Sequence, residues 1–250
     1  MLEVHPPHHA LNTWRDFFIH ITTIVIGLLI AIGLEQSVEA LHNRQQRFAL
    51  EHDLRVEAAK NLRLFALDDV FYDDKTVRLT SLRRYVEDLR GRRLQKFPPS
   101  NQPVPDIGSP IFWFPTISVW KTAKEGMFLS LLPRDEVAMF EEVYFENHRM
   151  RLTADKYFDT LGVQRRFAGT FNDQYDPAVP RPLSADASTL ERMTPDELKE
   201  YSVRISNALD ALQESRFVTN LARNASTAVL NGARSAEDVD KELAGDTSDD

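Results

Sequence analysis

The stretch F-F-I-H-I-T-T-I-V-I-G-L-L-I-A-I-G-L, from Phe17 to Leu34, decides the fold of this chain. Its eighteen residues include no Lys, Arg, Asp, Glu or Pro, and Asp16 and Glu35 flank it. A helix of this length measures about 27 Å, close to the ~30 Å hydrocarbon core of a bilayer. We therefore predict one transmembrane helix over residues 14–35, with the lipid bilayer as its partner, preceded by a disordered leader over residues 1–13.

A cleaved signal peptide is the alternative interpretation of this stretch, because Val38-Glu39-Ala40 offers a small-residue cleavage site. The apolar run is longer than the usual 7–15 residues, however, and Arg15 is the one Lys or Arg before it, so the pattern favours an uncleaved anchor. Arg44 and Arg47 after the span favour a cytoplasmic body. A short leader before an uncleaved apolar run is instead typical of an exported body, and we expect a periplasmic or external one.

Small residues follow one face of the predicted span. His20, Thr23, Gly27 and Ala31 recur at spacings of three and four, which allows a second helix to approach closely. Such residues also occur by chance in membrane spans. The pattern predicts a homo-oligomer or a membrane-protein partner.

The remaining residues have the composition of one soluble domain, with 27% charged and 42% hydrophobic residues in the whole chain. The net charge is −8, and the tail from Ser235 to Asp250 holds seven acids and one base. Nothing in this balance predicts nucleic-acid binding. The absence of cysteine excludes disulfides and thiolate metal sites.

Residues 36–95 have the composition of a stalk helix, since neither Gly nor Pro occurs between Glu35 and Arg90. We expect this helix to continue the span and to end at Gly91, a natural C-terminal residue. The alternative is a helical hairpin that turns near residues 68–74. Apolar residues recur at helical spacing, at Leu54, Ala58, Leu62, Phe65, Leu79, Leu82, Val86 and Leu89.

A cluster of bases lies near the end of the stalk. Three interpretations compete for this cluster: a solvated helix end, a docking site for the acidic tail, and a phosphate or lipid-headgroup patch. Its members are Arg83, Arg84, Arg90, Arg92 and Arg93.

After the stalk we expect a Pro-rich and aromatic loop over residues 96–116, which contains six prolines. A helical domain over 117–232 follows, with one long helix from Arg134 to about Phe171. Thr194-Pro195-Asp196-Glu197 predicts another helix start, because Thr caps, Pro fills the first turn and Glu closes a capping box. The acidic remainder, 233–250, is predicted to be disordered. The expected fold is therefore mainly α, a bundle with little or no β structure.

If the body has a ligand or interface pocket, we expect it where Trp113, Trp120, Lys121 and Glu125 converge with the loop. The alternative is a core tryptophan beside a solvated ion pair. No phosphate loop, nucleophile elbow or zinc-protease motif is present, and we predict no catalytic residue, metal site or cofactor.

Three segments resemble a family of small bacterial single-pass membrane proteins of unassigned function. They are R-D-F-F-I-H-I-T-T-I-V-I-G-L-L-I-A-I-G-L-E-Q (15–36), L-R-V-E-A-A-K-N-L (54–62) and I-S-V-W-K-T-A-K-E-G-M-F-L-S-L-L-P (117–133). The resemblance covers about the first 90 residues and the third segment. It implies residence in a bacterial inner membrane and supplies no activity. The expected function is a structural or interaction module, with a ligand-sensing module or an enzyme of unrecognised type as alternatives.

Overall fold

The computed structural model describes residues 14–98, 102–107, 112–161 and 187–245. These residues form helices, turns and extended segments, with no strand among them. The mainly α fold predicted from the sequence is confirmed. The leader, the end predicted for the helix from Arg134 and the last five residues lie outside the described ranges.

Helix α1, Trp14–Leu94, is one continuous helix of 81 residues. The stalk thus follows the span without the hairpin turn near residues 68–74. The predicted end at Gly91 is wrong: α1 passes through Gly91 and ends one turn later. There the amide of Phe97 donates to the carbonyl of Arg92 (2.7 Å) and that of Lys96 to Arg93 (3.1 Å), with Lys96 left-handed at φ 60°. Lys96 therefore fills the position that glycine usually takes in such a helix end.

The chain divides into two compact units, residues 1–50 and 51–250. In the first, α1 contains an eighteen-residue window of mean hydropathy 2.5 with no buried side chain. Among the described residues it is the one helix long and apolar enough to cross a membrane.

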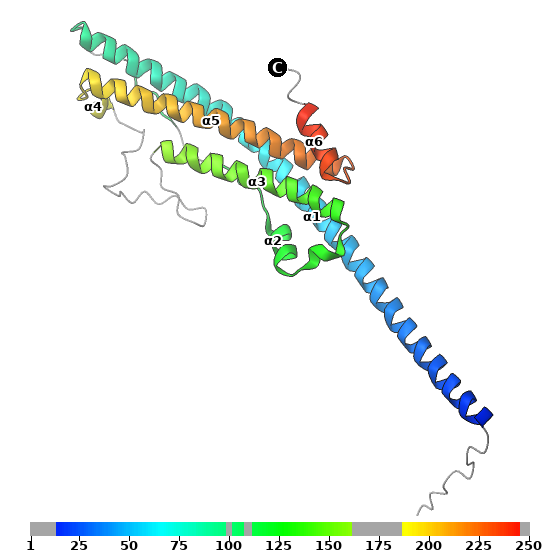
Figure 1. The fold of residues 1–250 in the computed structure, drawn as a ribbon. Coiled ribbons are helices and arrows are strands. Elements are labelled where there is room, and N and C mark those ends of the chain that lie inside the picture. The colour runs from blue at the N-terminus through cyan, green and yellow to red at the C-terminus, as the bar shows by residue number, and fades with distance from the viewer. Residues whose placement is uncertain (1–13, 99–101, 108–111, 162–186, 246–250) are drawn as a thin grey trace, which may run out of the picture. The chain divides into compact units, whose positions relative to one another are not determined.

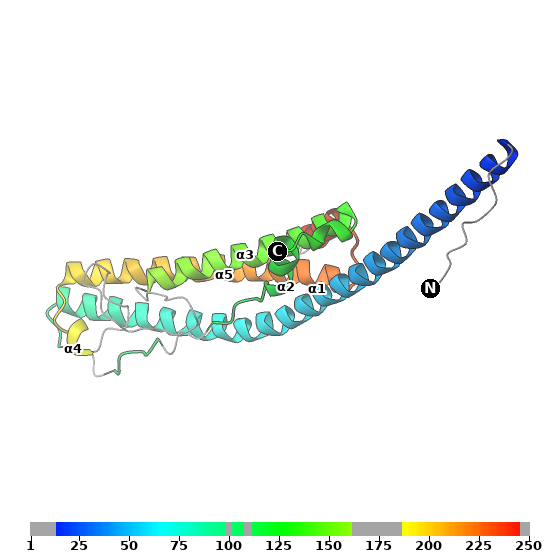
Figure 2. The same cartoon turned by 90° about the horizontal axis from the view of Figure 1, so that it is seen from below.

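The second unit is a helical bundle built from residues 51–94 of α1, from α3 (Arg134–Thr160) and from α5 (Pro195–Leu230) (Figures 1 and 2). Residues 51–94 and α5 run antiparallel, because Arg55 bonds the carbonyl of Val229 whereas Arg93 bonds that of Met193. The Tyr72 hydroxyl lies between these points, 2.7 Å from the hydroxyl oxygen of Thr219.

The bundle core uses the helical spacing expected from the sequence. Leu54, Phe65, Leu79 and Val86 are fully buried, and Leu62 packs against the core from its edge. Side chains of α3 and α5 complete the core, including Tyr157, Phe158, Leu198 and Ile205. Burial of such side chains is the main favourable term in forming the bundle.

Short helices complete the second unit. Helix α2 (Ser118–Glu125) and the 3₁₀ turn η1 (Phe128–Leu131) precede α3, and α4 (Ala187–Leu190) precedes α5. The predicted capping box is present, since Thr194 accepts from the amide of Glu197 and the Glu197 carboxylate accepts from the amide of Thr194.

The prediction of a disordered acidic tail is wrong for its first part. Residues Ala236–Gly245 form helix α6, which packs on α3 and α5. Val239 is fully buried in that contact, and Asp238 accepts from the amides of Arg234 and Ser235 at the helix start. A buried apolar residue and a local cap thus accompany helix formation in a segment whose net charge predicted disorder.

Candidate functional site

A row of buried polar side chains follows one face of α1 within the bundle. Glu57, Asn61, Asp68 and Lys75 are each at most 4% exposed, although their residue types are usually solvated. Their spacings of four, seven and seven residues place them on one side of the helix. Each bonds a residue of the described stretches 102–107 or 112–120, and we call these four residues the polar row.

Glu57 caps helix α2 from another element. The residue before α2, Ile117, has no side chain able to cap it. The Glu57 carboxylate instead accepts from the Ser118 hydroxyl (2.9 Å) and from the amides of Val119 (3.0 Å) and Trp120 (3.4 Å). A carboxylate at this end of a helix also meets the positive end of its dipole.

The Glu57 carboxylate also reaches α3, where the Tyr144 hydroxyl donates to it. Burial, and then the bond to Glu57, raise the pKa of Tyr144 well above its usual range. One side chain of α1 thus holds α2 and α3 together.

Asn61 pairs with the backbone of Thr116 as a neighbouring strand would. Its side-chain oxygen accepts from the Thr116 amide (2.8 Å), and its side-chain nitrogen donates to the Thr116 carbonyl (2.9 Å). Both backbone polar groups of Thr116 are therefore paired without a neighbouring strand.

Asp68 holds the next part of the segment and is fully buried. One carboxylate oxygen accepts from the amide of Trp113 at 2.9 Å, while the other has no hydrogen-bond partner. Burial is the main reason that the pKa of Asp68 is raised to about 7, with the Trp113 amide acting in the opposite direction. Asp68 can therefore hold a proton in the folded protein near neutral pH.

Lys75 ends the row. Its ammonium donates to the Ile107 carbonyl (2.8 Å) and to Asp74 (3.3 Å), and it lies 5.5 Å from the centre of the Phe71 ring. Along α1, the polar row thus bonds first the start of α2, then Thr116, Trp113 and Ile107. The order of these contacts is opposite to the direction of α1.

The four residues of the predicted pocket do not form one site. Trp120 is buried and stacks on Tyr144 with ring centroids 4.9 Å apart, whereas Lys121 and Glu125 are exposed and lie 3.8 Å from each other. Trp113 is 47% exposed. The amides of Trp113 and Trp120 bond α1 at residues eleven positions apart, about 16 Å along the helix.

The basic cluster is divided among local partners. Arg90 pairs with Glu87 (3.4 Å) and Arg92 with Asp88 (2.7 Å), both within α1. Arg93 donates to the carbonyls of Met193 and Leu190, beside the start of α5. Arg84 is exposed and Arg83 partly so.

The described part of the acidic tail does not dock on this cluster. It follows the C-terminal end of α5, whereas Arg93 contacts the residues before its N-terminal end (Figure 1). Arg234, just before α6, pairs with Glu51 and Glu136 instead. Tail docking is therefore contradicted for residues 236–245.

The small-residue face of the span is accessible along its length. His20, Thr23, Gly27 and Ala31 are all exposed, and a Cβ atom added at Gly27 would meet nothing within 4 Å. The Thr23 hydroxyl donates to the carbonyl of Ile19 at 2.9 Å, which satisfies it within the helix. A partner on this face stays a prediction.

No local sequence signal marks the polar row, because its partners on other elements lie 32 to 87 residues further along the chain. The described residues contain no group of three or more side chains suited to a metal ion. Comparison with protein-family models, curated proteins and solved structures finds no match to this chain. The fold and the polar row together define the class of protein. It is a helical bundle in which one helix, α1, also carries an exposed apolar segment.

Proposed function

We propose that this protein is a single-pass, membrane-anchored helical interaction module of a bacterial inner membrane. One observation carries the proposal: the apolar window of α1 has no buried side chain, while the bundle in residues 51–245 covers its own core. An exposed surface so apolar is stable in lipid and costly in water.

The construction of the bundle also supports an interaction role. The polar row uses its buried carboxylates, amide and ammonium to fix a backbone segment to α1. Such fixing gives α2 and the half-exposed Trp113 a defined position on the bundle, as a recognition surface requires. The family resemblance noted in the sequence adds the bacterial inner membrane.

The proposed assembly is a homo-oligomer or a complex with another membrane protein, and its bundle lies on the periplasmic side. A short leader before an uncleaved span supports that side, against the opposing count of Arg44 and Arg47.

Extraction of membranes with alkaline carbonate tests the anchor. We expect the full chain to stay in the pellet, because the predominantly apolar span of eighteen residues holds it in the hydrocarbon. Recovery of the intact chain in the supernatant contradicts the proposal.

Protease treatment of spheroplasts then tests the side. Periplasmic placement predicts loss of the bundle while the leader is protected. Protection of the bundle until lysis would show a cytoplasmic body. That result would contradict the periplasmic side and not the membrane anchor.

A further inference from the structure

The part of α1 that follows the span carries its own apolar seam. Val38 is 68% exposed, Leu41 59% and Phe48 54%. With Leu34 and Gln45 they recur at alternating spacings of four and three residues, which is the heptad pattern of a coiled coil. We call Val38, Leu41, Gln45 and Phe48 the juxtamembrane seam.

Lipid is a poor cover for this seam. If α1 crosses the bilayer over Phe17–Leu34, Leu41 and Phe48 lie about 10 and 21 Å beyond Leu34 along the helix. The headgroup layer beyond the hydrocarbon is only about 5–8 Å thick on each side. Glu35 and Glu39 already mark the polar boundary. Two large apolar side chains therefore stand in water unless protein covers them.

We infer that the juxtamembrane seam pairs with the same seam of a second copy in a parallel, two-stranded coiled coil. This inference rests on the proposed membrane anchor, which forces two copies to run parallel. Val38 and Leu41 then take the a and d positions, and a β-branched residue at a with leucine at d favours two strands.

Gln45 points to a second copy as the occupant. It falls at the next a position, where two identical residues meet across the two-fold axis. A glutamine amide both donates and accepts, so each Gln45 can satisfy the other. Most other side chains presented by a different partner would leave part of this amide unpaired.

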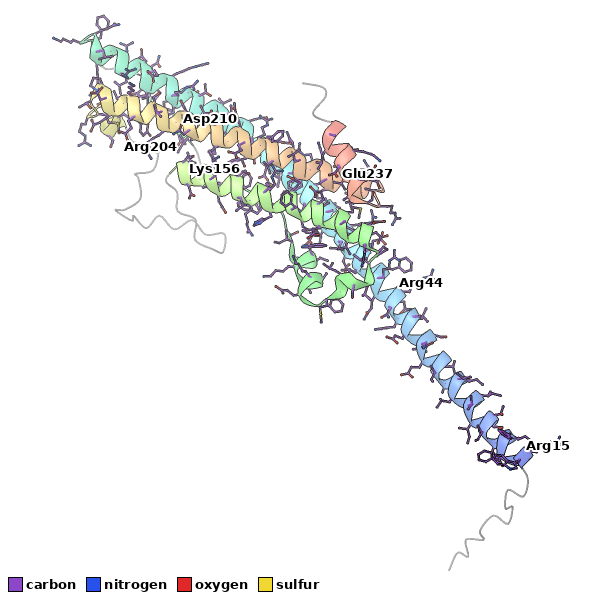
Figure 3. All side chains as sticks on the ribbon, viewed as in Figure 1. Arg15, Arg44, Lys156, Arg204, Asp210 and Glu237 are labelled. Carbon is purple, nitrogen blue, oxygen red and sulfur yellow. The ribbon has the colours of Figure 1, made fainter. Side chains whose placement is uncertain are left out.

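The charges beside the seam are compatible with this pairing. In a parallel dimer each g position faces the e position five residues later in the other copy. Here Ser37 faces His42 and Arg44 faces Ala49, so no like charges meet. Arg44 (Figure 3) lies 5.5 Å from the centre of the Phe48 ring and covers one edge of the seam.

Anchoring also makes a short seam sufficient. Two copies in one membrane have a much higher effective concentration than free chains, so few heptads are needed for pairing.

The absence of cysteine allows a direct test by single-cysteine crosslinking of the full chain in native membranes. We expect Val38→Cys and Leu41→Cys to form disulfide dimers at least fivefold more than Ala40→Cys and Asn43→Cys, which lie off the seam. Disulfides need Cα atoms about 4.4–6.8 Å apart, which only facing seam positions provide. In a Leu41→Glu background, the crosslink through Phe48→Cys should fall to the off-seam level.

The product should have the mass of two copies. Equal yields at all four positions, no crosslinking in a membrane-bound chain, or an adduct with a different protein would each overturn the inference. The membrane pellet is assayed in the same sample, so a soluble chain counts against the anchor itself. A pelleted chain with a flat profile counts against the seam alone.

Discussion

The two parts of α1 handle polarity in opposite ways. From Phe17 to Phe48 the helix presents apolar side chains on its surface, with Ile24, Leu28 and Val38 each at least 60% exposed. Within the bundle, the same helix buries Glu57, Asp68 and Lys75 almost completely. In water both arrangements are unfavourable, because the first exposes apolar surface and the second removes charged groups from solvent.

The difference shows that each part is matched to a different partner. Glu57, Asp68 and Lys75 each bond backbone groups between Ile107 and Trp120, and one Asp68 carboxylate oxygen is left without a partner. The exposed apolar groups have no such cover within the described chain, so lipid and a second copy are the surroundings that we propose.

Two lysines in the middle of the span should have the largest effect. Ile26→Lys with Leu29→Lys should cost about 6 kcal/mol of insertion free energy, since each charge costs roughly 3 kcal/mol at the centre of a helix in the membrane. We expect the variant to move to the soluble or aggregated fraction after lysis.

The matched control is Val70→Lys with Val77→Lys, on residues of the bundle that are 69% and 66% exposed. Because water already surrounds these side chains, the control should stay in the membrane with a change within about 0.5 kcal/mol. Equal behaviour of the two pairs would contradict the contrast.

Removal of the Glu57 carboxylate should destabilise the bundle by about 3 kcal/mol, because it leaves several buried donors unsatisfied. For Glu57→Ala this corresponds to a Tm roughly 6–12 °C lower by circular dichroism of the solubilised chain. Glu200→Ala, at an exposed position of α5, should leave the Tm nearly unchanged. An unchanged Tm for Glu57→Ala would mean that α2 does not need this cap.

Asp68 should make the stability of the bundle depend on pH. Its pKa is raised to about 7 in the folded protein, so the folded form binds the proton more tightly than the unfolded form. Its stabilising contribution is therefore complete below about pH 4 and is lost as the pH rises to about 7. A shift of this size corresponds to about 4 kcal/mol at full effect and on the order of 2 kcal/mol after partial screening.

Asp68→Asn tests this dependence, since asparagine keeps an acceptor for the Trp113 amide without ionising. Thermal unfolding from pH 4 to pH 8 should show a smaller decline for Asp68→Asn than for the natural chain. Asp53→Asn, at an exposed position of α1, should keep the natural decline. Parallel curves for Asp68→Asn and the natural chain would rule out this role of Asp68.

Loss of the helix cap at Thr194 should have the smallest effect. Thr194→Ala should cost about 1 kcal/mol, the usual value for such a cap. Thr194→Ser retains the hydroxyl and should recover most of the loss. Guanidinium titration of the three forms distinguishes these values.

Local signals predicted much of the fold. The apolar run and the capping box at Thr194–Glu197 depend on residues a few positions apart, and both could be recognised in the sequence. The prediction that the helix ends at Gly91 failed because backbone geometry decides a helix end. Lys96, and not Gly91, adopts the left-handed conformation there.

Long-range polar contacts could not be predicted. Glu57, Asn61, Asp68 and Lys75 resemble solvated residues of a charged helix, and most of their distant partners are backbone groups. Backbone groups carry no sequence signal, so only the fold reveals the polar row. The pocket prediction at Trp120 failed for a similar reason. Trp120 stacks on Tyr144 of α3, and this contact between two helices is not visible in the sequence.

Cysteine accessibility along α1 tests the central contrast most directly, since the natural chain has no cysteine. Leu28→Cys and Val70→Cys replace apolar residues that are 60% and 69% exposed on the same helix. In opened membranes, a charged maleimide should label Leu28→Cys at least tenfold more slowly than Val70→Cys, and the two should become equal in denaturing detergent. Equal labelling of the two variants in the opened membranes would place both side chains in water and would contradict burial of Leu28 in lipid.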